Sequence, residues 1–266
     1  MLTIAESNDD VPLPPGEIGR ILAAMQKLEP WDISAEVTAP FPERPFDGLF
    51  TITTELSPMT VPSFEPNRPS ETELLLSRLL EKTLRRSGAL DTESLCLIAG
   101  AKVWSVRADV HVLAHDGNLV DAACSAVIAA LQHFRRPDTS TEGEAVTVYT
   151  LAEREPVPLS LLHLPLCVTF SFYGDAGETM LLDATGLEEQ LRDGWVTIGM
   201  NRHGEVCQVA KLGGVPVNAV DLLHCTSVAL VKVKDISAFI AKRLGEDAKK
   251  RDKGGMMAEL SAEHAR

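Results

Sequence analysis

The chain has 266 residues and carries 25 Lys and Arg side chains against 38 Asp and Glu side chains, a net charge of −13 at neutral pH. Its length suits one large or two small domains, and with 45% hydrophobic and 24% charged residues it is expected to fold. We expect neither a secreted nor a membrane-spanning protein, and no polyanion can bind such an acidic chain except at a local basic patch set among partner proteins.

The sequence predicts little regular structure at its start. Residues 1–32 are polar and proline-rich, with a short amphipathic stretch, and form an atypical, partly disordered N-terminal segment. Runs with strand composition follow at 33–38 and 49–56. Prolines then crowd into a short stretch that neither a helix nor a central strand could accommodate, which predicts a long, stiff loop: Pro58, Pro62, Pro66 and Pro69.

A helix is predicted to begin after Ser70, because Glu73 completes a capping box with it, and to end at Gly88. At roughly 100° per residue, three basic side chains share one face and leucines occupy the opposite side. The basic residues are Arg78, Lys82 and Arg85. Such a stripe is usually a solvated face, but in a chain this acidic it is also a candidate contact for a polyanion.

The middle of the chain has the clearest periodicity. Residues 104–112 alternate between apolar and polar side chains, which predicts a strand. After a turn at 116–118, residues 119–134 are apolar nearly all round and rich in alanine, which predicts a helix buried against a sheet. A polar segment with Pro156 and Pro158 then indicates a linker or crossover.

The second half repeats this order. We expect one hairpin at 166–172 and 179–182, another at 195–200 and 205–210, and a helix from 220 to 244 that ends at Gly245. The domains are therefore predicted as two α+β halves of similar build, 33–150 and 151–245, followed by a charged and disordered tail, 246–266.

Candidate catalytic residues are few. The spacing of the seven histidines and five cysteines matches no metal or nucleophile motif, so we interpret them as structural, with the cysteines reduced and mostly in the core. The carboxylates of Asp183, Glu188 and Glu189 follow a strand, where they could hold a divalent metal or act as general acid and base. Capping of a short helix explains them equally well.

Several stretches resemble the RNase PH-like ring subunits of the eukaryotic RNA exosome, in particular the branch of the PM/Scl autoantigen. They are LDTESLC at 90–96, GAKVW at 100–104, VHVL at 110–113, HDGNLVDAA at 115–123 and HFRRPD at 133–138. The resemblance extends from about residue 33 to 245. The opening helix and Arg-x-Asp-Gly-Arg segment of that family are not matched, so we expect the first strands of the first half to be missing and its sheet to have an exposed edge.

The resemblance implies an RNase PH-like domain of the ribosomal protein S5 domain 2-like type, built from two ββαβ-type halves. It also implies a six-membered ring of such subunits, capped by S1/KH proteins and threading single-stranded RNA for 3′–5′ processing and degradation, including rRNA maturation. The expected location is the nucleus and nucleolus, and also the cytoplasm. Basic residues at the positions of Arg78, Lys82 and Arg85 would line the RNA path.

Active members of this family bind phosphate at a Gly-Gly-Thr/Ser-Arg loop before the buried helix. Here Leu119 and Val120 stand in place of Thr/Ser and Arg, and Asp121 adds a negative charge where phosphate would bind. We therefore expect a non-catalytic ring subunit with no catalytic residues, metal or cofactor. The alternative is a phosphorolytic 3′–5′ exoribonuclease in which the Asp183 cluster holds Mg²⁺.

Overall fold

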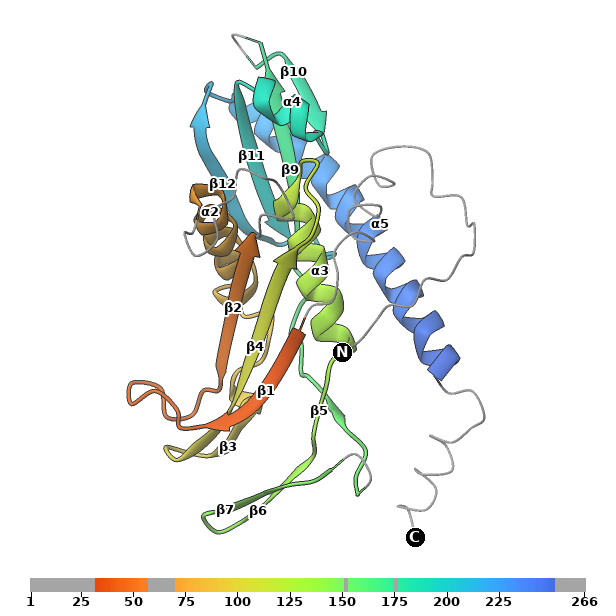
Figure 1. The fold of residues 1–266 in the computed structure, drawn as a ribbon. Helices are drawn as coiled ribbons and strands as arrows, with labels where there is room; N and C mark the ends of the chain where they lie inside the picture. The colour runs from red at the N-terminus through yellow and green to blue at the C-terminus, as the bar shows by residue number, and fades with distance from the viewer. Residues whose placement is uncertain (1–31, 57–69, 151–152, 175–176, 252–266) are drawn as a thin grey trace.

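The computed structural model describes residues 32–56, 70–150, 153–174 and 177–251. The expectations for the N-terminal segment, for the proline-rich loop and for the tail beyond residue 251 lie outside these ranges. Figure 1 shows two sheets with the helices α3 and α5 running alongside them. Within the described ranges, no helix is both long enough and apolar enough to span a membrane.

The sheet of the first half is built around β4 (Lys102–Val112), which pairs antiparallel with β1 (Asp32–Thr38) and parallel with β2 (Leu49–Leu56). A short strand, β3 (Cys96–Ile98), pairs with the start of β4. Along β4 the apolar side chains are buried and alternate with more exposed polar ones, as its period of two predicts. Among the described residues, β1 and β2 are the outer strands of this sheet.

Two helices belong to this half. The α2 helix (Glu71–Leu80) begins as predicted, since the hydroxyl of Ser70 accepts a hydrogen bond from the Glu73 amide at 3.1 Å. It continues as a π-helical turn (Glu81–Arg85) and stops before Gly88, whose φ is +74°. The α3 helix (Leu119–His133) is largely buried and packs against β9 of the second half, so it is the central helix that its alanines predict.

The second half forms an antiparallel sheet in the order β10-β9-β11-β12. Both predicted hairpins are confirmed. The elements are β9 (Leu166–Tyr173), β10 (Thr179–Leu182), α4 (Gly186–Leu191), β11 (Gly194–Met200), β12 (Val206–Gly214) and α5 (Ala219–Arg251). Each half thus runs strand, strand, helix, strand, strand, helix, which extends the predicted ββαβ pattern by one strand and one helix.

The predicted linker contains strands that were not expected, and the expected end of the last helix is wrong. The predicted linker contains a pairing of β5 (Arg135–Arg136) with β8 (Val157–Pro158) and a hairpin of β6 (Thr139–Glu142) and β7 (Ala145–Val148). The α5 helix does not end at Gly245 but continues to Arg251. A glycine inside a helix costs only about 1 kcal/mol. The last turns of α5 carry an ion pair between Arg243 and Glu246 and a hydrogen bond of 3.2 Å between His133 and Asp247.

The two halves share one hydrophobic core rather than two. At the π-helical turn, the hydroxyl of Thr83 donates a hydrogen bond to Gln208 on β12 at 3.0 Å. Gly199 on β11 leaves the space that Thr83 fills, because a Cβ atom there would lie 3.0 Å from the Thr83 methyl group. The helix of the first half is therefore fitted to the sheet of the second.

Candidate functional site

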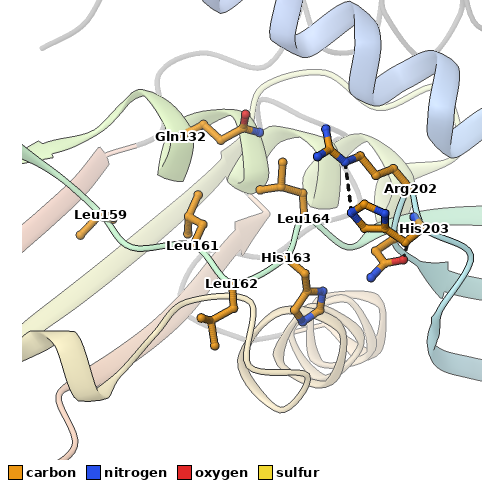
Figure 2. A pocket seen from close by; sticks show the side chains of 9 residues that line it. Gln132, Leu159, Leu161, Leu162, His163, Leu164, Arg202 and His203 are labelled. Atoms are coloured by element: carbon orange, nitrogen blue, oxygen red, sulfur yellow. Dashed lines mark hydrogen bonds between the residues drawn. The ribbon is translucent and has the colours of Figure 1, made fainter.

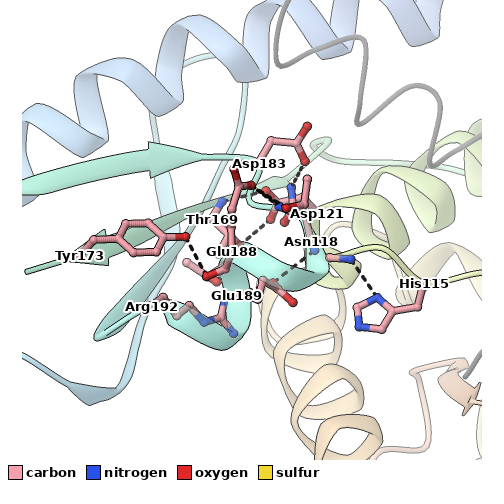
Figure 3. Close-up of polar contacts among 12 residues, drawn as sticks. His115, Asn118, Asp121, Thr169, Tyr173, Asp183, Glu188, Glu189 and Arg192 are labelled. Atoms are coloured by element: carbon pink, nitrogen blue, oxygen red, sulfur yellow. Dashed lines mark hydrogen bonds and ion pairs between the residues drawn. The ribbon is translucent and has the colours of Figure 1, made fainter.

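The turn before α3 lies directly on the loop that follows β10, so the two halves of the chain meet there (Figure 3). A Cβ atom on Gly117 would lie 2.2 Å from the carbonyl oxygen of Ala184, and only glycine fits this contact. Asn118 and Asp183 both adopt the left-handed conformation, with φ of 49° and 56°. This tight approach brings the start of α3 within hydrogen-bond distance of the predicted carboxylate cluster.

Asn118 joins the turn to two of these carboxylates. Its side-chain amide donates a hydrogen bond to Asp183 at 2.9 Å, and its backbone N–H donates one to Glu189 at 3.2 Å. Glu189 also forms an ion pair with Arg192 at 3.0 Å. The N-terminus of a helix favours an anion because its free N–H groups and its dipole both attract negative charge. Here the carboxylate of Glu189 takes that position.

Asp121 does not point where the sequence analysis placed it. Its side chain is 1% exposed and turns into the protein, where it accepts two hydrogen bonds of 2.7 Å from the amide and the hydroxyl of Thr169 on β9. Burial raises the pKa of this carboxyl to about 6, although the two hydrogen bonds from Thr169 oppose the rise. The carboxylates that contact Asn118 at the start of α3 are therefore those of Glu189 and Asp183, whereas the carboxylate of Asp121 faces the core.

The third predicted carboxylate has a local structural role. Glu188 accepts hydrogen bonds from the amide and hydroxyl of Thr185, at 2.7 and 2.8 Å, and so completes the capping box of the short helix α4. The capping interpretation is thus confirmed for Glu188. Across the described ranges, no group of three or more His, Cys, Asp or Glu side chains is arranged to hold a metal ion.

The basic residues of the α2 helix and its π-helical turn are exposed. Arg78, Lys82 and Arg85 face solvent, while the leucines predicted for the other side are buried or half-buried. Arg85 forms an ion pair with Glu81 at 3.2 Å, and Arg86 approaches the same carboxylate at 3.9 Å. This role of Glu81 was not predicted, although its spacing of four residues from Arg85 is the usual one for a helical ion pair.

The histidines and cysteines behave mainly as structural groups. His163 forms a hydrogen bond of 2.9 Å to the carbonyl oxygen of Ser87, and all five cysteines are free, three of them buried. Leucines, His163 and the β11–β12 turn surround a pocket of about 320 Å³ (Figure 2). Neither the basic residues of α2 nor the carboxylates around Asn118 line this pocket.

Comparisons with known proteins agree with this architecture. Residues 32–137 match the model of domain 1 of the 3′ exoribonuclease family, and residues 163–232 match the model of domain 2. The chain is 52% identical to the exosome complex component rrp45 of Schizosaccharomyces pombe over 220 residues, covering 83% of this chain and 75% of that protein. It is 48% identical to RRP45 of Saccharomyces cerevisiae over 246 residues, covering 88% of this chain and 80% of that protein.

Human RRP45 is 46% identical over 223 residues, which cover 84% of this chain but 51% of that longer protein. Among solved structures, the Archaeoglobus fulgidus exosome with RNA bound to the active site aligns with a TM-score of 0.67 and 28% identity, over 78% of this chain and 77% of that chain. An archaeal exosome core aligns with a TM-score of 0.59 and 26% identity, over 82% of this chain and 76% of that chain.

Proposed function

The chain belongs to the RNase PH-like 3′ exoribonuclease family, and from this premise we propose that it serves as a non-catalytic ring subunit of the RNA exosome. Its partners are other RNase PH-like ring subunits and the S1/KH cap proteins, and together they guide single-stranded RNA into 3′–5′ processing and degradation, including rRNA maturation. We place this work in the nucleus, with a nucleolar share, and in the cytoplasm. The assembly is supported by relatives that are named exosome complex components and that this chain matches along most of their length.

One observation carries the non-catalytic part of the proposal. The backbone N–H of Asn118, at the start of α3, is taken by the carboxylate of Glu189 at 3.2 Å. A phosphate at this position would lie beside Glu189 and Asp183, and like charges at such short range repel strongly. Leu119 and Val120, where the family has Thr/Ser and Arg, offer no cationic or hydroxyl group to compensate. Phosphorolysis needs bound phosphate, so this site does not support it.

The alternative, a phosphorolytic exoribonuclease, has one observation in its favour. Asp183 and Glu189 both bond to Asn118, so two carboxylates lie together as a Mg²⁺ site would require. However, the guanidinium of Arg192, which contacts this cluster, is engaged with Glu189 and lies over the ring of Trp195 at 5.0 Å. It is not free to hold the attacking phosphate, and the non-catalytic function is the better supported of the two.

RNA guidance rests on Arg78, Lys82 and Arg85. These residues are exposed on one helix of an otherwise acidic chain, and the helix is anchored on its other side by buried leucines. At about 1.5 Å of rise per residue, the three side chains span roughly 10 Å, which matches one or two phosphate spacings of an extended strand. We assign them to the RNA path of the ring.

The assembly is tested by purifying the tagged chain from cells and identifying its partners by mass spectrometry. We expect the other ring subunits and the cap subunits to be recovered in near-stoichiometric amounts. The same tag on an unrelated acidic protein is the control for adventitious capture. Recovery of the tagged chain without ring subunits would refute the proposed function.

A further inference from the structure

The β6–β7 hairpin projects away from both sheets of the protein (Figure 1). Its strands pair over Thr139–Glu142 and Ala145–Val148 and pack mainly on each other. A two-stranded hairpin in water is marginally stable, because it has little core of its own and both of its edges are open. We therefore looked for contacts that stabilise this hairpin, within the chain or with another molecule.

One face of the hairpin is stabilised by contacts between side chains of this chain. Ser140 and Tyr149 form a hydrogen bond between their hydroxyls at 2.9 Å. The guanidinium of Arg154 lies 3.9 Å from the centroid of the Tyr149 ring and forms an ion pair with Asp138 at 2.9 Å. The contacts among these four residues hold the base of the hairpin and neutralise its one arginine, so this face offers little to another molecule.

The opposite face is different in character. Residues that are paired across an antiparallel ladder point to the same side, so Thr139 shares a face with Val148, and Thr141 shares it with Val146. All four side chains are β-branched, and Val148 is 46% exposed. This face is a short, stiff and largely apolar strip, which is the kind of surface that another protein covers.

The charge of the segment indicates what kind of surface the partner has. Residues 138–155 contain five carboxylates against a single arginine, and Glu142 and Glu144 lie at the tip on either side of Gly143. Both tip carboxylates are exposed. Such a surface repels RNA and attracts a surface rich in lysine and arginine. The partner that fits is a protein with a basic patch beside an apolar one.

We propose that the β6–β7 hairpin is a docking arm that lays its Thr139–Val148 face on a neighbouring protein subunit and extends its acidic tip to basic side chains of that subunit. Glu144 lies in the turn itself, and Glu142, which pairs with Ala145, projects from the opposite face and adds its negative charge to the tip. The inference rests on the proposed function only in taking this neighbour to be another subunit of the exosome. The arm would add an interface that projects beyond the compact body of the chain.

The test uses the tagged chain purified with its partners from cells. A reagent that couples carboxylates directly to lysine amines is applied to the complex, and the joined peptides are identified by mass spectrometry. We expect cross-links from Glu142 or Glu144 to a lysine of a different protein subunit. Glu178, which is exposed near the turn of another hairpin, is the internal control and should not show the same link.

Variants test whether the contact matters. The double variant Glu142→Lys and Glu144→Lys should recover about fivefold less of the cross-linked subunit than the wild type does. The purification is done in roughly 0.1 M salt, where charges still interact over about 10 Å. The variant Val148→Asp should also lower the recovery of that subunit, because it places a charge on the docking face. The control is Glu93→Lys with Glu178→Lys, which makes the same change in net charge elsewhere and should have no effect.

The outcomes separate the two proposals. If ring subunits are absent from the wild-type purification, the proposed function fails, and the docking arm is then supported only by a cross-link from Glu142 or Glu144 to one protein whose recovery falls in both variants. If ring subunits are present but no protein is cross-linked to Glu142 or Glu144, and both variants keep wild-type composition, the docking arm is refuted alone. Melting of each isolated variant checks that its core is intact.

Discussion

Asp121, in the first turn of α3, accepts two hydrogen bonds of 2.7 Å from Thr169 of β9, one from its amide and one from its hydroxyl. These bonds join the helix of the first half to the sheet of the second, and they continue to Thr197 on β11, whose hydroxyl lies 2.9 Å from that of Thr169. Because every member of the network is buried, a change of charge at Asp121 acts on the contact between the halves.

The pKa of Asp121 predicts how stability depends on pH. Its pKa in the folded chain is raised from 3.8 to about 6, so the folded state favours the protonated form. The stability that this group contributes is fully present below pH 4 and is lost as the pH rises through about 6. Between pH 4.5 and 7, the unfolding free energy of the wild type should fall by about 2 kcal/mol relative to that of Asp121→Asn. Urea titrations at both pH values measure this difference, and parallel behaviour of the two proteins would contradict it.

Gly117 is predicted to be the least replaceable glycine of the site. Gly117→Ala places a methyl group 2.2 Å from the carbonyl oxygen of Ala184, so the two loops must separate. We expect a loss of stability of at least about 3 kcal/mol. Gly88→Ala is the matched control, since Gly88 also has positive φ but nothing within 4 Å of the new methyl group, and it should cost about 1 kcal/mol. Equal losses in urea unfolding would show that the loops do not constrain Gly117.

The purified chain should show no phosphorolytic activity. Incubated with single-stranded RNA, Mg²⁺ and phosphate, it should release no nucleoside diphosphate above background, because Glu189 occupies the N–H group of Asn118 to which phosphate would bind. A phosphorolytic ribonuclease of the same family is the positive control. Activity that is abolished by Asp183→Asn would establish the alternative function instead.

The exposed basic residues of α2 should contribute to RNA binding by the assembled complex. Replacing Arg78, Lys82 and Arg85 with Gln should weaken binding and reduce the slope of log affinity against log salt by about two, at roughly 0.7 per phosphate contact. Assembly should persist, because the buried leucines lie on the other side of the helix. The control replaces Arg44, Lys102 and Arg107, which changes the net charge equally. The same salt slope in both triple variants would mean that the α2 residues are only a solvated face.

Glu81 is predicted to restrain RNA binding rather than support it. Its carboxylate lies 3.2 Å from Arg85 and 3.9 Å from Arg86, and it competes with phosphate for both. An exposed ion pair of this kind is worth about 0.2–1 kcal/mol, so Glu81→Gln should strengthen RNA binding by roughly 1.5- to 5-fold. Glu93→Gln controls for the loss of one negative charge. Weaker RNA binding by Glu81→Gln, measured beside that control, would show that Glu81 positions the arginines instead.

The local pattern of the sequence was enough to identify most elements. The alternation along β4 and the alanine-rich run of α3 each reflect burial that is repeated within a few residues, so they predict a strand and a buried helix directly. The capping of α2 by Ser70 is equally local, since donor and acceptor lie three residues apart. The resemblance of the 90–138 stretch to exosome ring subunits supplied the family, which the comparisons confirm.

The candidate site, in contrast, was decided by the tertiary structure. Asn118 meets Asp183 and Glu189 across 65 and 71 residues of chain, and no periodicity in either segment encodes that contact. The direction in which Asp121 points depends on β9 lying beneath α3. Past Gly245, α5 meets His133 through Asp247, a contact between residues that lie 114 positions apart. Elements form from neighbours in sequence, whereas a carboxylate finds its partner only when the packing of two sheets brings distant segments together.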